Sequence, residues 1–270
     1  MNTFSDELKD RLIVYKKTRL GIQQNGFWRQ KEYSHILPKE CMYLNILEPI
    51  RKECIEYIRN NKIEKLLHEG FPHLNSSQAM CFNLFFPLIQ NKQLGYFLSL
   101  IGLNDWNIED YQFEKVLNTK EGTNFDFWII DKSGKELFVE VKLTETNFGK
   151  GKIEKHLSKK MDIYESGLKD IVDSIVIDSN LFYDYYQLLR NIYYLKDRSG
   201  GSSNKFVCVI TSKNNKTIIS EYMTIYNYIK PLYQKYIQIV FFEDLVNNCI
   251  NKFNGDISFI YKMFKEKYCI

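Results

Sequence analysis

The sequence predicts a mixed α/β fold, in which helices flank a central mixed β-sheet and a helical extension precedes it. Two short segments rich in aromatic and β-branched residues, 125–130 and 136–142, surround a turn and predict a β-hairpin. The continuous apolar segment 205–211 is typical of a strand buried at the centre of a sheet. With a helical pattern before the hairpin, a strand at 113–117 and a helical pattern after it, the expected order is α-β-β-β-α-β.

The composition allows a large core and excludes several classes of protein. The chain has 270 residues, of which 44% are hydrophobic, and a net charge of +4 that permits a polyanionic partner without requiring one. The six cysteines are scattered and lack zinc-ligand spacing, which indicates reduced thiols in a cytoplasmic protein. No secretory signal is visible and the longest apolar run, 82–89, is too short to span a bilayer, so we expect no membrane partner.

The N-terminal segment combines a helix with a basic and aromatic arm. Apolar residues at helical spacing predict an amphipathic helix over 5–18. In the following stretch, 23–38, Arg29 and Lys31 alternate with aromatic side chains. Such a mixture can grip a nucleic-acid backbone or stack on bases, and it can equally be an arm whose rings pack onto the domain.

Further helices are expected at 45–60, at 62–69 and from about 76 to 90, where a serine can cap the first turn. The last of these segments is nearly all apolar and therefore expected to be buried, with Gln78 and Asn83 as polar exceptions. A buried amide needs a hydrogen-bond partner, and an active-site carboxylate or a bound water could supply it.

The hairpin carries an unusual pair of charges. Side chains alternate across a strand, so Glu140 and Lys142 share one face of the second strand with Phe138. The opposite face, with Leu137, Val139 and Val141, is expected to be the core side. Gly134 lies in the turn and is free to adopt a positive φ.

Asp126, near the start of the first hairpin strand, is expected to lie close to Glu140 once the strands pair. Two oxygen ligands that converge at a strand edge suit a hard cation such as Mg²⁺, which Mn²⁺ could replace. Lys142 could orient a water molecule or offset the charge of a phosphate. The alternative is a hairpin with a solvated Glu–Lys pair and no chemistry.

An Asp, a loop and then Glu-x-Lys on the next strand resembles the PD-(D/E)xK nuclease superfamily, which has the restriction-endonuclease-like fold. The resemblance covers about residues 76–211, and upstream segments resemble an uncharacterised bacterial restriction-like subgroup. It implies that Asp126, Glu140 and Lys142 are catalytic, and that the two carboxylates hold the metal with the Val141 carbonyl as a further ligand. The chain departs from the superfamily pattern in having Phe125 where a proline is usual. In the superfamily the helix before the sheet often supplies an acidic group near the metal, and this chain offers amides there instead.

Two segments after the hairpin are candidates for contacts with DNA. The first is basic and contains glycines, with Lys150, Lys152 and Lys155, and it leaves the strand where a phosphate backbone would pass. Lysines in such a position are otherwise simply solvated.

The second segment is a helix expected from 180 to about 197, on which Gln187, Arg190 and Asn191 share one face. The resemblance implies that this face lines the site and reaches the phosphates of the scissile strand. A half-buried guanidinium also needs an anion, although a polar surface with no role is the simpler alternative.

The remainder predicts a helix over 217–234, a strand over 236–242 and two helices within 243–267. No linker rich in proline or glycine divides the chain, so we expect a single domain. Its parts would be the extension 1–75, the core 76–211 and a C-terminal addition, 212–270.

The resemblance implies an Mg²⁺-dependent endonuclease acting on double-stranded DNA, most simply a type II restriction-like enzyme. Such an enzyme is expected to be a homodimer, because two sites are needed to cut both strands. A repair or mobile-element nuclease would carry the same residues. A non-catalytic DNA-binding protein and an RNA-cleaving enzyme are further alternatives.

Overall fold

The computed structural model describes residues 3–118, 123–196 and 204–270. Internal contacts divide the chain into two compact units. The first comprises Met1–Trp106, Ser212–Asn214 and Phe241–Ile270, and the second comprises Asn107–Thr211 and Asn215–Val240. These bounds differ from the expected segments, because the helix from residue 77 belongs to the first unit and not with the sheet.

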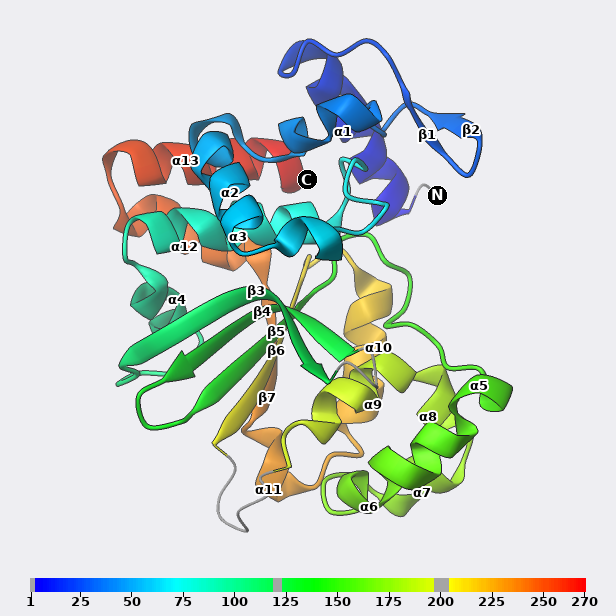
Figure 1. The fold of residues 1–270 in the computed structure, drawn as a ribbon. Coiled ribbons are helices and arrows are strands. Elements are labelled where there is room, and N and C mark those ends of the chain that lie inside the picture. The colour runs from blue at the N-terminus through cyan, green and yellow to red at the C-terminus, as the bar shows by residue number, and fades with distance from the viewer. Residues whose placement is uncertain (1–2, 119–122, 197–203) are drawn as a thin grey trace. The chain divides into compact units, whose positions relative to one another are not determined.

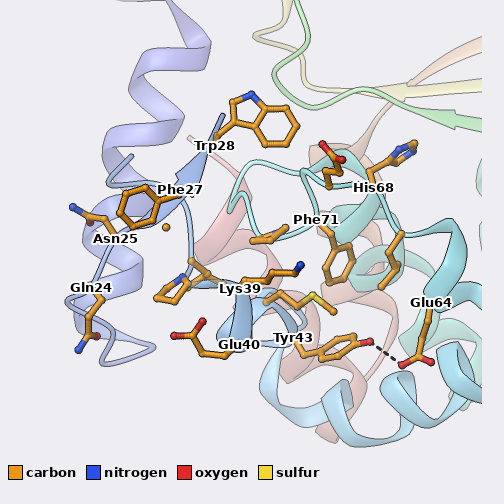
Figure 2. A pocket seen from close by; sticks show the side chains of 17 residues that line it. Gln24, Asn25, Phe27, Trp28, Lys39, Glu40, Tyr43, Glu64, His68 and Phe71 are labelled. Atoms are coloured by element: carbon orange, nitrogen blue, oxygen red, sulfur yellow. Dashed lines mark hydrogen bonds between the residues drawn. The ribbon is translucent and has the colours of Figure 1, made fainter. Parts of the chain in front are cut away.

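The first unit is mainly helical (Figure 1). Its elements are α1 (Phe4–Thr18), β1 (Gly26–Trp28), β2 (Lys31–Tyr33), the 3-10 helices η1 (Lys39–Asn45) and η2 (Ile63–Leu66), α2 (Glu48–Asn60), α3 (Ser77–Gln90), α4 (Leu94–Leu100), α12 (Phe242–Lys252) and α13 (Gly255–Tyr268). The Ser76 hydroxyl accepts a hydrogen bond from the Ala79 N–H, which confirms the expected cap of α3. The Tyr261 hydroxyl donates to the Leu84 carbonyl at 2.7 Å and so ties α13 to the buried helix α3. A pocket lies beside β1 (Figure 2).

The second unit is built on a five-stranded mixed sheet of order β3-β4-β5-β6-β7. The strands are β3 (Ile108–Asn118), β4 (Thr123–Asp131), β5 (Glu136–Val141), β6 (Lys205–Thr211) and β7 (Ile237–Phe241). The β3/β4 and β4/β5 pairs are antiparallel and the β5/β6 pair is parallel. The mixed α/β class, the hairpin and the bounds of β6 are therefore confirmed, and Gly134 in the turn has a φ of 82°.

Helices follow the hairpin in this unit (Figure 1): α5 (Ile153–Lys159), the π-helical turn η3 (Lys160–Tyr164), α6 (Glu165–Leu168), α7 (Ser174–Asp178), α8 (Leu181–Asp184), α9 (Tyr186–Tyr193), α10 (Lys216–Tyr226) and α11 (Pro231–Gln234). Apolar side chains of these helices other than α5 form one core with those of Phe125, Phe138 and Val207 from the sheet. Phe138 therefore faces a helix-covered core, so the strand is buried on this face in addition to the face expected from the sequence. Leu137 and Val139 are also fully buried, as befits a central strand.

The helix expected over 180–197 is interrupted at Tyr185, whose ψ of 31° is not helical. The preceding loop causes the break. The Gly151 N–H donates to the Tyr183 carbonyl at 2.7 Å, and the Gln187 N–H donates to the Gly149 carbonyl at 3.2 Å. Because the loop takes these groups, α8 ends and α9 begins anew at Tyr186. Among the described helices, none is long and apolar enough to cross a bilayer.

Candidate active site

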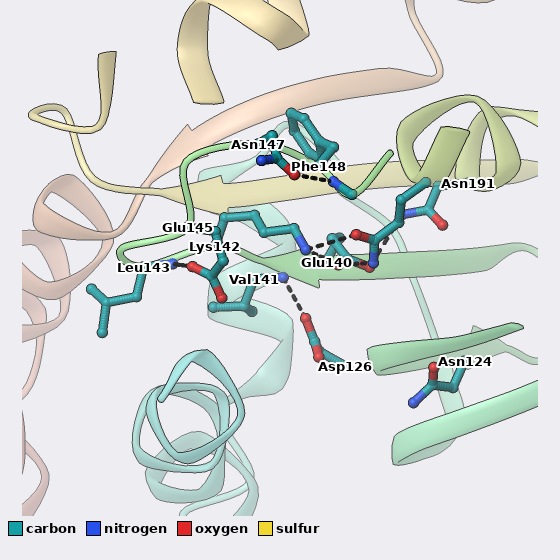
Figure 3. A network of polar contacts seen from close by, with 12 residues as sticks. Asn124, Asp126, Glu140, Val141, Lys142, Leu143, Glu145, Asn147, Phe148 and Asn191 are labelled. Atoms are coloured by element: carbon teal, nitrogen blue, oxygen red, sulfur yellow. Dashed lines mark hydrogen bonds and ion pairs between the residues drawn. The ribbon is translucent and has the colours of Figure 1, made fainter. Parts of the chain in front are cut away.

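The carboxylate of Asp126 lies between the two hairpin strands (Figure 3). The paired register runs from Ile130 opposite Glu136 to Phe127 opposite Val139. Beyond that pair, the Val141 N–H donates to Oδ2 of Asp126 at 2.6 Å. A side-chain oxygen of β4 thus accepts this main-chain N–H of β5, which holds the Asp126 carboxylate next to Val141.

Glu140 is buried beneath α9, with 4% of its surface exposed, and three donors surround its carboxylate. Oε1 accepts from Gln187 Nε2 at 2.8 Å and from Lys142 Nζ at 2.9 Å. Oε2 accepts from Asn191 Nδ2 at 3.1 Å. A buried charge needs such partners to be stable, so these contacts fix the orientation of the carboxylate.

Gln187 connects the two charges of the strand. Its Oε1 accepts from Lys142 Nζ at 3.0 Å, while its Nε2 donates to Glu140. The Gln187 amide therefore bonds to both the ammonium and the carboxylate, in agreement with its expected place on the polar face of the helix.

A loop before α5 holds Gln187 in place, and sequence reasoning missed it. Gly149 has a φ of 93°, and a Cβ there would lie 3.1 Å from Oε1 of Gln187. The neighbouring Phe148 N–H donates to Glu221 of α10 at 2.9 Å, which anchors the loop to the unit. The glycine was visible in the sequence, but only the fold shows what lies opposite it.

A third carboxylate, Glu114, lies next to Asp126. Phe113 pairs with Phe127 and Lys115 pairs with Phe125, so Glu114 is opposite Asp126 across β3 and β4. It is 1% exposed and accepts from the Asn124 amide at 2.8 Å. The sequence placed this residue on a strand, but its proximity to the site depends on the strand register.

Carboxylates outnumber cations around Asp126. Burial raises the pKa of Asp126 well above its usual value, and the carboxylates of Glu140 and Glu114 add to that effect. The ammonium of Lys142 and the Val141 N–H act in the opposite direction but do not outweigh it.

Lys142 is a buried cation. Burial lowers its pKa, but the carboxylates of Glu140, Glu145 and Asp126 outweigh burial and raise the pKa above its usual value. The side chain is therefore protonated at neutral pH and supplies positive charge and hydrogen-bond donors.

The donor set fits a divalent cation in part. Asp126 and Glu140 are the hard oxygen ligands that Mg²⁺ favours. Burial, and then the neighbouring carboxylates, raise the pKa of Asp126, and a bound cation would act in the opposite direction. Over the described ranges, no group of three or more His, Cys, Asp or Glu side chains is arranged to hold a metal ion. A metal ion at this site would therefore be bound by two carboxylates together with oxygen atoms of other groups.

The two amides of α3 have other partners than those expected. Gln78 Oε1 accepts from the His68 N–H and its Nε2 donates to the Leu66 carbonyl. Asn83 Oδ1 accepts from the Leu47 N–H at 2.8 Å. These bonds correct the expectation of an active-site carboxylate as partner, because the amides satisfy main-chain groups at the ends of short helices in the first unit.

Arg190 and Asn191 differ in what they can contact. Asn191 is fully buried against Glu140, so its expected contact with DNA is corrected to a contact within the site. The Arg190 guanidinium lies 6.0 Å from the Tyr186 ring. Its Nε is buried and has no hydrogen-bond partner among the described residues.

The expected basic residues are dispersed. Lys150 forms an exposed ion pair with Asp184 at 3.2 Å, and Lys152 is exposed. The side chain of Lys155 lies outside the described part of the structure. Arg29 and Lys31 are exposed on the β1–β2 hairpin of the first unit, over the rings of Trp28 and Tyr33 respectively.

Comparison with known proteins identifies a family for almost the whole chain. A family model described as "Restriction Endonuclease associating with ARP" (REase-ARP) matches residues 9–269. No curated protein and no solved structure matches the chain.

Proposed function

The chain belongs to the REase-ARP family of restriction endonucleases, and we propose that it hydrolyses phosphodiester bonds of double-stranded DNA with a divalent cation. The observation that carries the proposal is the convergence of Asp126, Glu140 and Lys142 at the end of the β4–β5 pair. We interpret this arrangement as the site of a metal-dependent nuclease of the PD-(D/E)xK type.

Asp126 and Glu140 would hold Mg²⁺, or Mn²⁺ in its place, with the Val141 carbonyl as a third oxygen. The bound cation would polarise the phosphoryl oxygen and lower the pKa of a coordinated water. Glu140 now accepts three hydrogen bonds, so its donors would share the carboxylate with the ion.

Lys142 would stabilise negative charge that develops on the phosphoryl group. Its ammonium is buried and held by Glu140 and Gln187, so it needs little reorganisation to act. The raised pKa supports this role as a cation over a role as a base in the free protein.

Arg190 would contact a DNA phosphate near the scissile bond. A guanidinium with a buried and unpartnered Nε is suited to a two-pronged hydrogen bond with phosphate oxygens. Lys150 and Lys152, on the loop that leaves β5, would make more distant backbone contacts, as would Lys155.

Each chain carries a single candidate site within its described residues, so cutting both strands in one event calls for two copies. We propose a homodimer acting as a type II restriction-like enzyme in the cytoplasm. A repair or mobile-element nuclease would use the same residues in the same roles.

The test is cleavage of supercoiled and linear DNA in Mg²⁺ by the wild type and by the Asp126→Ala and Lys142→Ala variants. Asp110→Ala and Lys132→Ala, at exposed positions of the same unit, are matched controls. We expect cleavage by the wild type and by both controls only. If the wild type and the site variants behave alike, the proposal is wrong.

Calorimetric titration with Mg²⁺ separates catalysis from DNA binding alone. The wild type should bind the ion and Asp126→Ala should not. A protein that binds DNA but shows no Mg²⁺ affinity dependent on Asp126 would be a non-catalytic member of the family.

A further inference from the structure

The first unit contains a pocket of about 790 Å³ that the proposed cleavage reaction does not use (Figure 2). Its walls come from β1, from η1 and from the segment that follows η2. The volume lies within the range typical of ligand sites, roughly 300–1,000 Å³.

Aromatic rings form several of its walls. Phe71 is buried, and the Tyr43 ring lies 6.1 Å from it. Phe27 is 68% exposed and has no ring contact with any described residue. Figure 2 shows Phe27 and Phe71 on opposite sides of the pocket in that view. An exposed phenylalanine facing a fixed aromatic wall is suited to hold a planar ring by stacking.

The polar side chains of the pocket include several without a partner. Lys39, Glu40 and Glu69 form no ion pair or side-chain hydrogen bond with any residue that the structure describes. Glu64, in contrast, lies 3.5 Å from Arg59 and accepts from the Tyr43 hydroxyl. The available groups are therefore two carboxylates, which accept N–H donors, and one ammonium, which binds an anion.

The rim at β1 is held rigidly in place. The buried Lys16 Nζ donates to the Gln24 carbonyl at 2.9 Å and to Asn25 Oδ1 at 2.9 Å. Gly26 leaves no room for a side chain, since a Cβ would lie 2.2 Å from the Leu37 carbonyl oxygen. Burying the Lys16 ammonium costs free energy, which its hydrogen bonds to Gln24 and Asn25 offset. These bonds fix the wall of the pocket beside Phe27 before a ligand binds.

We propose that this pocket receives a single unpaired base of DNA. A nucleotide has the three features that the lining complements: a planar ring for the aromatic walls, amino groups for Glu40 and Glu69, and a phosphate for Lys39. A base inside a duplex presents only its edges, so the base must be unpaired or turned out of the stack. Arg29 and Lys31, exposed on the same hairpin, contact the phosphates on either side.

The choice of DNA as ligand rests on the proposed nuclease function, but the binding does not depend on cleavage. The experiment therefore uses the full chain in EDTA. Fluorescence anisotropy measures the affinity for a short labelled duplex with one central unpaired base and for the same duplex fully paired.

The wild type should bind the duplex with the unpaired base about tenfold or more tightly than the paired duplex. Phe27→Ala should lose about 5- to 150-fold in affinity for the unpaired base, the range for one stacked base. Phe259→Ala is the matched control, because it removes a phenylalanine that is 56% exposed on α13 of the same unit.

Equal binding of the two duplexes by the wild type, or equal binding by Phe27→Ala and Phe259→Ala, would overturn the proposal. Choline, whose quaternary ammonium also suits aromatic rings and carboxylates, should not compete, and full displacement by choline would also overturn it. If the protein cuts DNA but does not prefer the duplex with the unpaired base, only the proposed role of the pocket is refuted. If it shows the preference but does not cut DNA, only the proposed nuclease function is refuted.

Discussion

The main-chain N–H of Val141 donates to the carboxylate of Asp126 at 2.6 Å, at the point where the β4–β5 ladder stops. Because a main-chain donor holds the carboxylate, its position does not depend on the rotamer of a neighbouring side chain. Glu140, in β5, and Lys142, directly after β5, lie on either side of Val141 in the chain. One hydrogen bond thus ties Asp126 of β4 to the strand that carries Glu140, the other carboxylate of the proposed site.

Replacement of Asp126 by Asn should separate catalysis from stability. The substitution keeps a hydrogen-bond acceptor for Val141 and removes a charge whose pKa is raised by burial and by Glu140 and Glu114. We expect cleavage to be abolished and the metal-free protein to become more stable, with a Tm higher by roughly 2–4 °C for each kcal/mol of relief. Thermal unfolding in EDTA near pH 8 measures the change, and a Tm below that of the wild type would contradict the account of the charge.

Replacement of Gly149 by Ala should impair the site through Gln187. The new methyl would lie 3.1 Å from the oxygen of Gln187, which contacts Lys142. We expect cleavage to fall by about 10- to 100-fold, as for Gln187→Ala, which is the usual effect of losing a group that orients a metal ligand. Plasmid cleavage rates measure it.

Gly134→Ala is the matched control for that variant. Gly134 also has a positive φ, of 82°, but a Cβ there would contact nothing within 4 Å. Both variants should lose about 1–2 kcal/mol of stability through backbone strain, and only Gly149→Ala should lose activity. Equal activity of the two would exclude a positioning role for the glycine.

The stability of the protein should fall with pH partly through His35. Burial and the nearby Lys9, His73 and Lys16 lower the pKa of His35 to about 4, against 6.5 when unfolded. Between pH 6.5 and about 4 the unfolded chain takes up a proton at this residue that the folded chain does not. The free energy of unfolding therefore includes the full contribution of neutral His35 above pH 6.5, and that contribution is lost as the pH falls from 6.5 to about 4.

Urea denaturation at pH 7.5 and at pH 5 tests the role of His35. The difference in free energy of unfolding between the two values should be smaller for His35→Gln than for the wild type. His156→Gln, which changes a half-buried histidine of α5 in the second unit, is the control. An unchanged difference in His35→Gln would contradict the assignment.

Replacement of Arg190 by Ala should weaken DNA binding in a manner that depends on salt. When a guanidinium neutralises one phosphate, the counterions of that phosphate are released. The slope of log K against log salt should therefore be smaller in magnitude by about one in the Arg190→Ala variant. Binding titrations in EDTA over a range of salt concentrations measure the slope. Lys132→Ala, an exposed cation in the hairpin turn, should leave it unchanged. The same slope in both variants would mean that Arg190 does not contact the backbone.

Several elements follow from the sequence because their causes are local. Ser76 caps α3, Gly134 turns the hairpin, and the apolar run Lys205–Thr211 is β6. Such features depend on residues a few positions apart, whose chemistry is the same in any fold. The alternation of β5 likewise determined that Glu140 and Lys142 share a face.

Other features were decided only by contacts between segments far apart in the chain. Glu114 reaches Asp126 through the β3–β4 register, and the Gly149 loop breaks the helix at Tyr185 by taking its main-chain partners. Gln78 bonds to main-chain groups because buried amides satisfy whichever donor packing brings to them. Local patterns carry no record of such distant neighbours. The sequence alone therefore determined which side chains are candidates for the proposed site, and the tertiary structure decided what surrounds them.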